Sequence, residues 1–278
     1  MQPITTEIVS RTIIKRPADS HKGNYGRIML IGGNQNFGGA IIMAATAATY
    51  SGAGLVTVAT DPSNFTSLHA RLPEAMVIDY HQTDTLLNLL AGMDVIVIGP
   101  GLGTDTVADQ LLTAVLAATH VPQRLVIDGS ALTLLAQQAR PLPATDIVVT
   151  PHQMEWQRLS GIAIKDQTPT ANHDAQQRLG VTAVVKAHRT TVYTDERVWF
   201  NPGGTPAMAT GGMGDTLAGM IGGFVSQFHN FTDAVLSAVY LHSAIADDLA
   251  ATRYVVLPHQ ISARIPTYMH RFNQIERP

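Results

Sequence analysis

The sequence predicts an α/β protein built on an open, doubly wound and mostly parallel sheet with helices on both faces. Short runs such as 27–31 and 95–98 are apolar throughout and rich in β-branched residues, which is typical of strands buried on both faces. These runs alternate with longer helical stretches, as in right-handed parallel crossovers. Glycine clusters follow several of the strands, at the edge where open α/β sheets bind ligands.

The first two predicted strands form a strand–loop–helix–strand unit. Residues 1–24 are polar and mixed, and we expect an arm or a first helix there. A strand at 27–31 then leads through a glycine-containing loop at 32–39 into an alanine-rich helix at 40–51. The next strand is predicted at 55–59, so a parallel crossover joins the two strands.

The same alternation continues through the middle of the chain. Strands are predicted at 75–79, 95–98, 125–127 and 147–149, and helices at 85–90, 106–118, 131–138 and 153–159. The repeated order of strand and helix extends one parallel layered sheet.

The pattern changes near the end of the chain. Three short strands at 183–186, 191–193 and 198–200, with a turn at 195–196, predict a small antiparallel edge. Helices follow at 216–226, 232–251 and 260–273. Because the sequence contains no linker, repeat or low-complexity stretch, we expect one domain over residues 1–278.

The composition excludes several classes of function. The 278 residues are 45% hydrophobic and 14% charged, which is enough for a large core. A net charge of −3 gives no support for nucleic-acid or membrane-surface binding. The chain has no cysteine, which excludes disulfides, thiolate metal sites and cysteine nucleophiles. We expect a soluble, cytoplasmic protein, because neither a signal peptide pattern nor a long unbroken apolar run is present.

The glycine-rich stretch from Asn201 to Asp215 is the strongest functional signal. Its five glycines and two prolines predict a loop that ends at a helix N-terminus. Glycines allow the backbone to approach a ligand closely, and the free N–H groups of a first helical turn attract an anion such as phosphate. Asp215 would take a proton from a hydroxyl that attacks phosphorus, or it is only a helix cap. The stretch is neither a Walker loop nor a Rossmann fingerprint.

Two polar residues follow the strand predicted at 147–149. His152 and Glu155 lie one helical turn apart, so that as a pair they would bind substrate and hold a magnesium-bound water. The alternative is a capping arrangement, in which Thr150 starts the helix and Glu155 occupies its first turn.

Three further candidates lie at strand ends or on a helix. Lys186 ends a strand and would contact phosphate, or it is simply solvated. Asp128 ends another strand beside the same edge, where an N-cap role is equally compatible. His242 lies in an apolar helical stretch and is interpreted as a packed histidine. The histidines show no paired metal-binding spacing, and no Gly-x-Ser-x-Gly elbow of a hydrolase is present.

Taken together, these motifs resemble a known family. The matching pieces, in chain order, are Gly26-Arg-Ile-Met-Leu-Ile-Gly-Gly33, Phe37-Gly-Gly-Ala40, Ser51-Gly-Ala-Gly-Leu-Val-Thr57, Gly99-Pro-Gly-Leu-Gly103, Thr150-Pro-His-Gln-Met-Glu155, Lys186-Ala-His-Arg-Thr190 and Ala209-Thr-Gly-Gly-Met-Gly-Asp215. In this order and spacing they look like the ADP/ATP-dependent NAD(P)H-hydrate dehydratases of the ribokinase-like superfamily. The resemblance covers about residues 20–272 and implies a three-layer α/β/α sandwich.

The resemblance implies a metabolite-repair enzyme that acts on the S epimer of hydrated NADH or NADPH (NADHX or NADPHX). In the family, a nucleotide phosphorylates the hydroxyl group that water added to the nicotinamide ring. Phosphate then leaves and the reduced nicotinamide is restored. Single-domain bacterial members mostly use ADP and release AMP and phosphate, with Mg²⁺ as the implied cofactor and ATP as the other donor. Many members are tetramers, which implies a homo-oligomer here.

Roles in the family transfer to the matching positions of this chain. Asp215 resembles the catalytic base, and Ala40, Gly103, His152 and Asp215 resemble the positions that contact the hydrate. Gly212, Met213 and Gly214 resemble the anion hole, with Gly214 also near the nucleotide. Glu155 resembles the magnesium-associated acid, which acts through water. The loop that contacts AMP in the family corresponds to Lys186, Ala187, His188, Arg189 and Thr190.

Three positions depart from the family pattern. Met213 stands where the family commonly has Ser or Thr, which removes a hydroxyl group but leaves the N–H donors. Ala187 and Met154 each stand where glycine is common.

Two other functions compete with the dehydratase. The first is a ribokinase-superfamily kinase that phosphorylates a small vitamin precursor or a sugar and releases a stable phosphate ester. The second is a non-catalytic nucleotide sensor on the same fold. His152 favours the dehydratase, because many vitamin kinases of the superfamily resemble this region but carry asparagine at this position. Asp215 disfavours the sensor, which would need no base.

Overall fold

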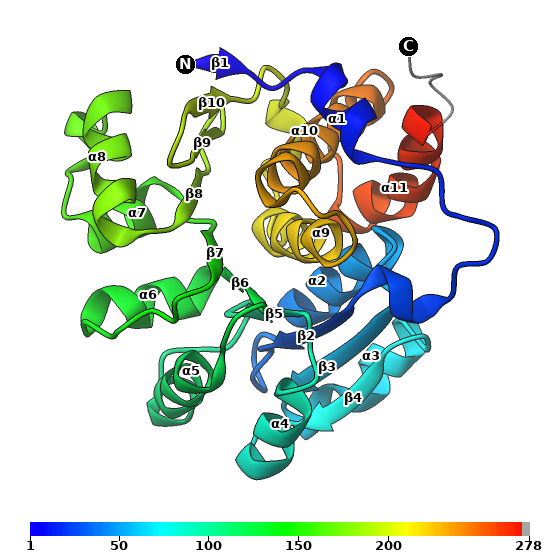
Figure 1. The fold of residues 1–278 in the computed structure, drawn as a ribbon, viewed down its shortest axis with the longest axis vertical. Helices are drawn as coiled ribbons and strands as arrows, with labels where there is room; N and C mark the ends of the chain where they lie inside the picture. Colours follow the sequence, from blue (N-terminus) through cyan, green and yellow to red (C-terminus); the bar gives the residue numbers. More distant parts are fainter. Residues whose placement is uncertain (274–278) are drawn as a thin grey trace.

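The computed structural model describes residues 1–273 and is built on one ten-stranded sheet with the strand order β1-β10-β9-β8-β7-β6-β5-β2-β3-β4. The strands are β1 Gln2–Pro3, β2 Arg27–Ile31, β3 Leu55–Thr60, β4 Met76–Asp79, β5 Val95–Ile98, β6 Arg124–Ile127, β7 Asp146–Val149, β8 Thr182–Val185, β9 Thr191–Tyr193 and β10 Val198–Phe200. Strands β2 to β8 pair in parallel, whereas β9 pairs antiparallel with both β8 and β10. The predicted fold, a mostly parallel sheet with an antiparallel edge, is confirmed (Figure 1).

Helices cover both faces of this sheet. They are α1 Thr6–Thr12, α2 Gly38–Tyr50, α3 Phe65–Arg71, α4 Thr83–Leu90, α5 Thr106–Ala118, α6 Gly129–Gln137, α7 Gln153–Ser160, α8 Pro169–Leu179, α9 Met213–Gln227, α10 Phe231–Ala250 and α11 Pro258–Asn273. Figure 1 shows α9, α10 and α2 on one side of the strands, and α5, α6 and α7 on the other.

Each strand contributes to two hydrophobic cores because successive side chains point to opposite faces. In β2, Ile28 and Leu30 belong to the core that includes residues of α2, α9, α10 and α11, whereas Met29 and Ile31 belong to the core that includes residues of α4 to α8. All four of these side chains are fully buried. This burial on both faces explains why the strands are apolar without alternation.

The structure adds three elements that the sequence did not predict. Residues 2–3 form β1, which pairs in parallel with β10, whereas the first helix at residues 6–12 is one of the two expected alternatives for this segment. Helices α3 and α8 lie in stretches for which no helix was predicted. Helix α8 is mostly polar, yet its ends carry recognisable signals: Thr168 caps its start before Pro169, and Gly180 follows its end with a positive φ.

Helix α9 begins three residues earlier than predicted, and this shift matters for the site. Gly212 is its N-cap residue and adopts φ 92° and ψ −6°, a left-handed conformation that favours glycine. Met213, Gly214 and Asp215 therefore form the first helical turn rather than the end of a loop. The N–H groups of such a turn have no carbonyl partner within their own helix.

A close helix crossing holds α9 over the sheet. The backbone of α9 approaches α2 so closely that a Cβ atom at Gly219 would overlap the Ala44 carbonyl oxygen. Gly219→Ala should therefore lower the free energy of unfolding by about 1–3 kcal/mol, the usual penalty for overpacking a core. Urea titration measures this loss. Gly92→Ala is the control, because its Cβ would meet only the Leu89 carbonyl oxygen at 3.6 Å. Equal stability of the two variants would contradict the crossing.

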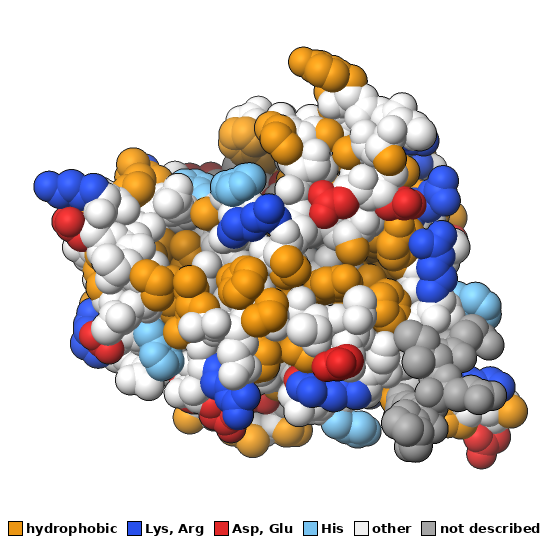
Figure 2. Space-filling model, turned by 90° about the horizontal axis from the view of Figure 1, so that it is seen from above, with side chains coloured by type: hydrophobic (Ala, Val, Ile, Leu, Met, Phe, Trp, Pro, Cys, Tyr) orange, Lys and Arg blue, Asp and Glu red, His pale blue; other side chains and the backbone are white. Residues whose placement is uncertain are grey.

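Charges of both signs are interspersed on the face that lies at the top of Figure 1. Figure 2 shows this face with apolar side chains across its middle and acidic and basic side chains around them. No large area of one sign is visible there. Within residues 1–273, no helix combines the length and apolar character that a membrane span requires.

Candidate active site

The loops that follow β2 and β5 are joined at the carboxyl edge of the sheet. The N–H group of Gly33 donates to the Pro100 carbonyl oxygen at 2.8 Å, and that of Asn34 donates to the Gly101 carbonyl oxygen at 2.7 Å. A Cβ atom at Gly101, where φ is 63°, would lie 2.9 Å from the Ala40 Cβ. This close approach places the predicted substrate residue Ala40, in the first turn of α2, beside the loop that carries Gly103.

A second series of contacts joins the ends of β5, β6, β7 and β8. The Gly103 N–H group donates to Ser130 Oγ at 3.1 Å. Asp128, at the end of β6, accepts a hydrogen bond on Oδ1 from the Thr150 hydroxyl at 2.6 Å. The Lys186 N–H group donates to the Pro151 carbonyl oxygen at 2.8 Å, so the end of β8 is fixed beside the end of β7.

Lys186 links this strand edge to the first turn of α9. Its Nζ donates to Asp128 Oδ1 at 2.9 Å, and a Cβ atom at Gly214 would lie 3.0 Å from the same Nζ. The ammonium group therefore lies against the backbone of the predicted anion hole. The lysine is paired with a carboxylate and its side chain is only 20% exposed, so the solvated alternative for Lys186 is wrong.

Asp215 lies in the same charged cluster. Burial raises its pKa to about 6, with the negative charge of Asp128 as the next largest cause, while Lys186 opposes the rise. A carboxyl group with a pKa near neutrality is matched to the work of a general base. Its place in the first turn of α9 adds a physical reason for function beyond capping, because the N-cap residue of this helix is Gly212.

The charged groups around Lys186 influence one another. Burial works to lower the pKa of Lys186, but Asp128 and Glu155 outweigh it and the net shift is upward. Burial raises the pKa of Glu155, which is 8% exposed. His242 is buried as predicted, and burial together with the positive charge of Lys186 lowers its pKa to about 4. His242 is therefore neutral at physiological pH.

His152 and Glu155 form a reciprocal cap at the start of α7. His152 Nδ1 accepts from the N–H groups of Met154 and Glu155 at 3.1 and 3.3 Å, and Glu155 Oε2 accepts from the His152 N–H group at 2.8 Å. The expected capping arrangement exists, but its first residue is His152 and not Thr150. Because the His152 side chain is 53% exposed, its Nε2 side remains accessible to a ligand.

The loop predicted to contact AMP lies beside the start of the glycine-rich stretch. The Asn201 N–H group donates to the Thr190 carbonyl oxygen at 2.8 Å, and a Cβ atom at Gly204 would lie 3.7 Å from the His188 carbonyl oxygen. The side chains of Ala187, His188 and Arg189 are exposed at this edge. The loop predicted to contact AMP is thus a neighbour of the glycine-rich stretch that leads to Gly214.

The structure changes the interpretation of Asp128. It occupies the N-cap position of α6, but its side chain makes no capping hydrogen bond and turns instead to Thr150 and Lys186. The sequence carried only the signal that each of these residues ends a strand of one parallel sheet. That signal places the residues at one edge of the sheet, but it does not specify which side chains form hydrogen bonds with one another.

The site has the carboxylate that a magnesium ion would use. Mg²⁺ commonly keeps several waters and binds through one or two carboxylates and the phosphates of its substrate. Glu155 Oε1 makes only a 3.5 Å contact with His152 Nε2, so this oxygen is available to a metal-bound water. Within residues 1–273, no group of three or more histidine or acidic side chains is arranged as a complete metal cage. The residues therefore fit a metal held partly by a nucleotide.

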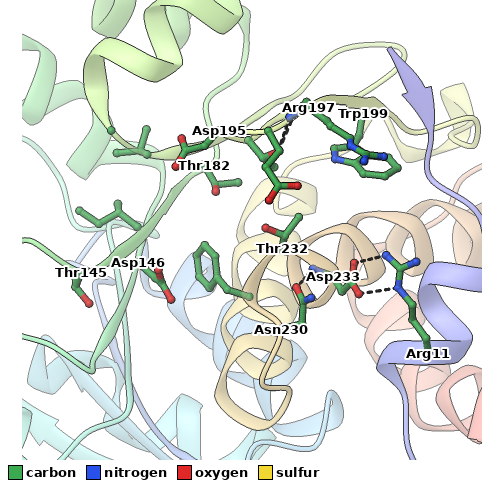
Figure 3. A pocket seen from close by; sticks show the side chains of 16 residues that line it. Arg11, Thr145, Asp146, Thr182, Asp195, Arg197, Trp199, Asn230, Thr232 and Asp233 are labelled. Atoms are coloured by element: carbon green, nitrogen blue, oxygen red, sulfur yellow. Dashed lines mark hydrogen bonds and ion pairs between the residues drawn. The ribbon is translucent and has the colours of Figure 1, made fainter.

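A cavity of about 760 Å³ lies at the opposite edge of the sheet. Figure 3 shows Asp146, Thr182 and Asp195 on one side of it and the start of α10 on the other. These residues lie at the amino ends of β7 and β8 and at the turn between β9 and β10. The described residues that line this cavity include no residue of the predicted site.

The geometry at the carboxyl edge suits phosphoryl transfer. A helix N-terminus and Lys186 offer positive potential to phosphate, and Asp215 offers a base in the same turn. The start of α2 with Ala40 and the loop with Gly103 provide a neighbouring surface for the group that is phosphorylated.

Comparisons with known proteins point in one direction. The family model described as NAD(P)H-hydrate dehydratase matches residues 28–267. The chain is 99% identical over 278 residues, covering both chains fully, to the ADP-dependent (S)-NAD(P)H-hydrate dehydratase of Lactiplantibacillus plantarum. A ribokinase-like superfamily protein from Enterococcus faecalis has a similar crystal structure, with a TM-score of 0.97, 51% identity, and coverage of 99% of this chain and 97% of that chain. The ADP/ATP-dependent NAD(P)H-hydrate dehydratase of Bacillus subtilis, co-crystallised with ATP/Mg²⁺, gives a TM-score of 0.86 at 30% identity and covers 98% of each chain.

Proposed function

Because the chain belongs to the NAD(P)H-hydrate dehydratase family, we propose that it uses ADP to dehydrate the S epimer of hydrated NADH or NADPH at the carboxyl edge of its sheet. The reaction returns the damaged cofactor to NADH or NADPH and releases AMP and phosphate. A single domain over residues 1–278 carries the whole reaction, with Mg²⁺ as cofactor and ATP as the second phosphate donor beside ADP.

Asp215 is the catalytic base of this proposal. Its carboxylate takes the proton of the substrate hydroxyl while that oxygen attacks the terminal phosphorus of ADP, and the bond from phosphorus to the AMP oxygen breaks. The N–H groups of Gly212, Met213 and Gly214 stabilise the charge on the transferred group. Lys186 adds a positive charge at the same turn.

The phosphorylated hydrate then collapses without further nucleotide. The lone pair of the ring nitrogen expels phosphate, and a neighbouring ring carbon loses a proton, which restores the dihydronicotinamide. Ala40, Gly103 and His152 orient the hydrate, while Lys186 to Thr190 and Gly214 contact the nucleotide. When bound, Mg²⁺ neutralises phosphate charge, and Glu155 would hold it through water.

One observation carries the proposal most strongly: a carboxyl group with a raised pKa lies in the first turn of a helix whose N-terminus is flanked by a lysine. A nucleotide sensor needs no base in this turn. The negative charge of the carboxylate would weaken phosphate binding, so a protein that only binds nucleotide would gain nothing from it. The family of the chain selects the hydrate over a vitamin precursor as the hydroxyl donor.

Product analysis tests this reaction. The protein is incubated with NADH hydrate, Mg²⁺ and ADP, and phosphorus NMR follows the products. Equal amounts of AMP and inorganic phosphate, matched by NADH, are expected. Accumulation of a stable phosphate ester without NADH would support a kinase instead.

The pH dependence of turnover should reflect Asp215. Because the base must be ionised, kcat/KM is expected to rise with pH and to level off above about 6, the pKa to which burial raises this group. An unperturbed aspartate would level off about two units lower. Initial rates of NADH formation between pH 4.5 and 8 measure the curve, with stability checked at each pH. A plateau already reached at pH 4.5 would contradict the assignment.

The resemblance to the family also leads us to propose a homotetramer that works in the cytoplasm. Light scattering coupled to gel filtration measures the number of chains in solution.

A further inference from the structure

Asp128 is a buried carboxylate for which the proposed reaction has no assigned task. It is 2% exposed and lies at the end of β6. Although it starts α6, it leaves the N-terminus of that helix uncapped. A buried carboxylate without partners destabilises a protein strongly, so Asp128 needs hydrogen-bond donors around it. The two donors that it has indicate what the residue does.

Both hydrogen bonds converge on one oxygen of Asp128. The Thr150 hydroxyl donates to Oδ1 at 2.6 Å and Lys186 Nζ donates to it at 2.9 Å. Thr150 is fully buried, so it orients the carboxylate rather than competing for it with solvent. Thr150, directly after β7, therefore fixes the orientation of Asp128, and Asp128 in turn holds Lys186, directly after β8.

Lys186 is held at two points, and both direct it to α9. Its backbone N–H group bonds to Pro151, which sets the direction of the side chain, and Asp128 fixes its ammonium group. In that position Nζ lies 3.0 Å from where a Cβ of Gly214 would be. Glycine at 214 thus leaves room for an ammonium group that is anchored from behind.

Two further carboxylates act electrostatically on the same ammonium group. Glu155 and Asp215 both favour the charged form of Lys186, while His242 is the uncharged neighbour from α10. Without Asp128, the long lysine side chain would be free to turn to either carboxylate. An ion pair with Asp215 would occupy the base and draw Lys186 away from the phosphate position.

We infer that Asp128 is a positioning residue: through one buried oxygen it anchors Lys186 against the phosphate-binding turn of α9 and keeps Lys186 from pairing with Asp215. This inference rests on the proposed function, because it assigns the task of Lys186 in that reaction. Asp128 itself acts only through the lysine.

A double-mutant cycle tests this dependence. The kcat and the ADP KM are measured for the wild type, Asp128→Asn, Lys186→Met and the double variant. Each single substitution should lower kcat/KM by about 100-fold, the size of effect expected when a charged group is misplaced at a reacting phosphate. The kcat/KM of the double variant should be no lower than that of the more impaired single variant, because Asp128 has no ammonium group to position once Lys186 is replaced. Losses that multiply in the double variant would overturn the inference.

Rescue and stability separate positioning from simple loss of structure. Asp128→Glu keeps the negative charge and should recover part of the lost kcat/KM, whereas recovery no better than that of Asp128→Asn would count against the anchor. Lys186→Met leaves the carboxylate buried and unpaired and should lower Tm, and adding Asp128→Asn should restore Tm. If Asp128→Asn does not fold, Thr150→Val replaces it in the cycle, with the same expected non-additivity.

Asp233→Asn is the matched control. Asp233 is 8% exposed and pairs with Arg11 at 2.6 Å beside the cavity at the other edge of the sheet, as Figure 3 shows. This variant removes an ion pair without touching Lys186, so kcat/KM should stay within about twofold of the wild type. Wild-type activity in the same assay tests the proposed function separately: an inactive, folded wild type would refute that function, whereas an active one with an additive cycle would refute only the role of Asp128.

Discussion

Asp215→Asn should reduce turnover of the hydrate by about a thousandfold or more while leaving nucleotide affinity largely unchanged. The substitution removes the proton acceptor but keeps the size and shape of the side chain. The carboxylate is not expected to help bind a phosphate, because its charge opposes that of the ligand. Stopped-flow measurement of NADH formation and calorimetric titration with ADP measure the two properties. Near-normal turnover in this variant would rule out Asp215 as the base.

The same variant should be more stable than the wild type at pH 8. The pKa of Asp215 is raised in the folded state, so its ionisation destabilises the fold as pH rises from about 4 to about 6, and the penalty is complete above that range. Asparagine carries no charge and avoids the penalty. Thermal unfolding should therefore show a higher Tm for Asp215→Asn at pH 8 and a much smaller difference at pH 4. A lower Tm at pH 8 would indicate that the carboxylate stabilises the fold.

Gly212→Ala should impair the anion hole and lower kcat/KM by about a hundredfold. The N-cap glycine has φ 92°, where an alanine is strained, and a Cβ there would overlap the Met43 side chain and lie 3.2 Å from Pro258 Cγ. The end of the Met43 side chain can shift aside, but the strain of an alanine at this φ is relieved only if the backbone at the start of α9 moves, and the N–H groups of the first turn move with it. Initial rates at varied ADP concentration measure the loss.

Gly211→Ala is the neighbouring control. Its φ is not positive, and a Cβ would meet no atom within 4 Å. We expect kcat/KM within about twofold of the wild type, because neither strain nor contact is introduced. If Gly211→Ala and Gly212→Ala were equally impaired, the geometry of the N-cap would not explain the effect.

The sheet was predictable because burial on both faces leaves a strong signal in the sequence. The buried runs at 27–31 and 95–98 match their strands at both ends, and so do the shorter runs of the antiparallel edge at 191–193 and 198–200, where β10 is only half-buried. What escaped prediction lacks such a signal. Helix α3 has only seven residues, β1 has two, and α8 buries few apolar side chains, so tertiary packing rather than local pattern sets them.

The site was predictable in its parts but not in its connections. The motifs placed Asp215, His152 and Lys186 at loops of one edge, because the carboxyl ends of parallel strands share that edge. The pairing of Lys186 with Asp128 joins residues 58 positions apart through their side chains. A hydrogen bond of this kind follows from side-chain packing, which a single sequence does not reveal. Similarly, the start of α9 depends on the left-handed conformation of Gly212. The sequence does not show which of Gly211, Gly212 and Gly214 adopts that conformation.

The most direct test of the account is recovery of the absorbance of reduced nicotinamide. Purified protein is incubated with NADH hydrate and Mg²⁺, with ADP, ATP or no nucleotide supplied in parallel. We expect the absorbance to return only where a nucleotide is present, and fastest with ADP. No recovery with either nucleotide, from folded protein that still binds ADP, would contradict the assignment of this chain as an ADP-dependent hydrate dehydratase.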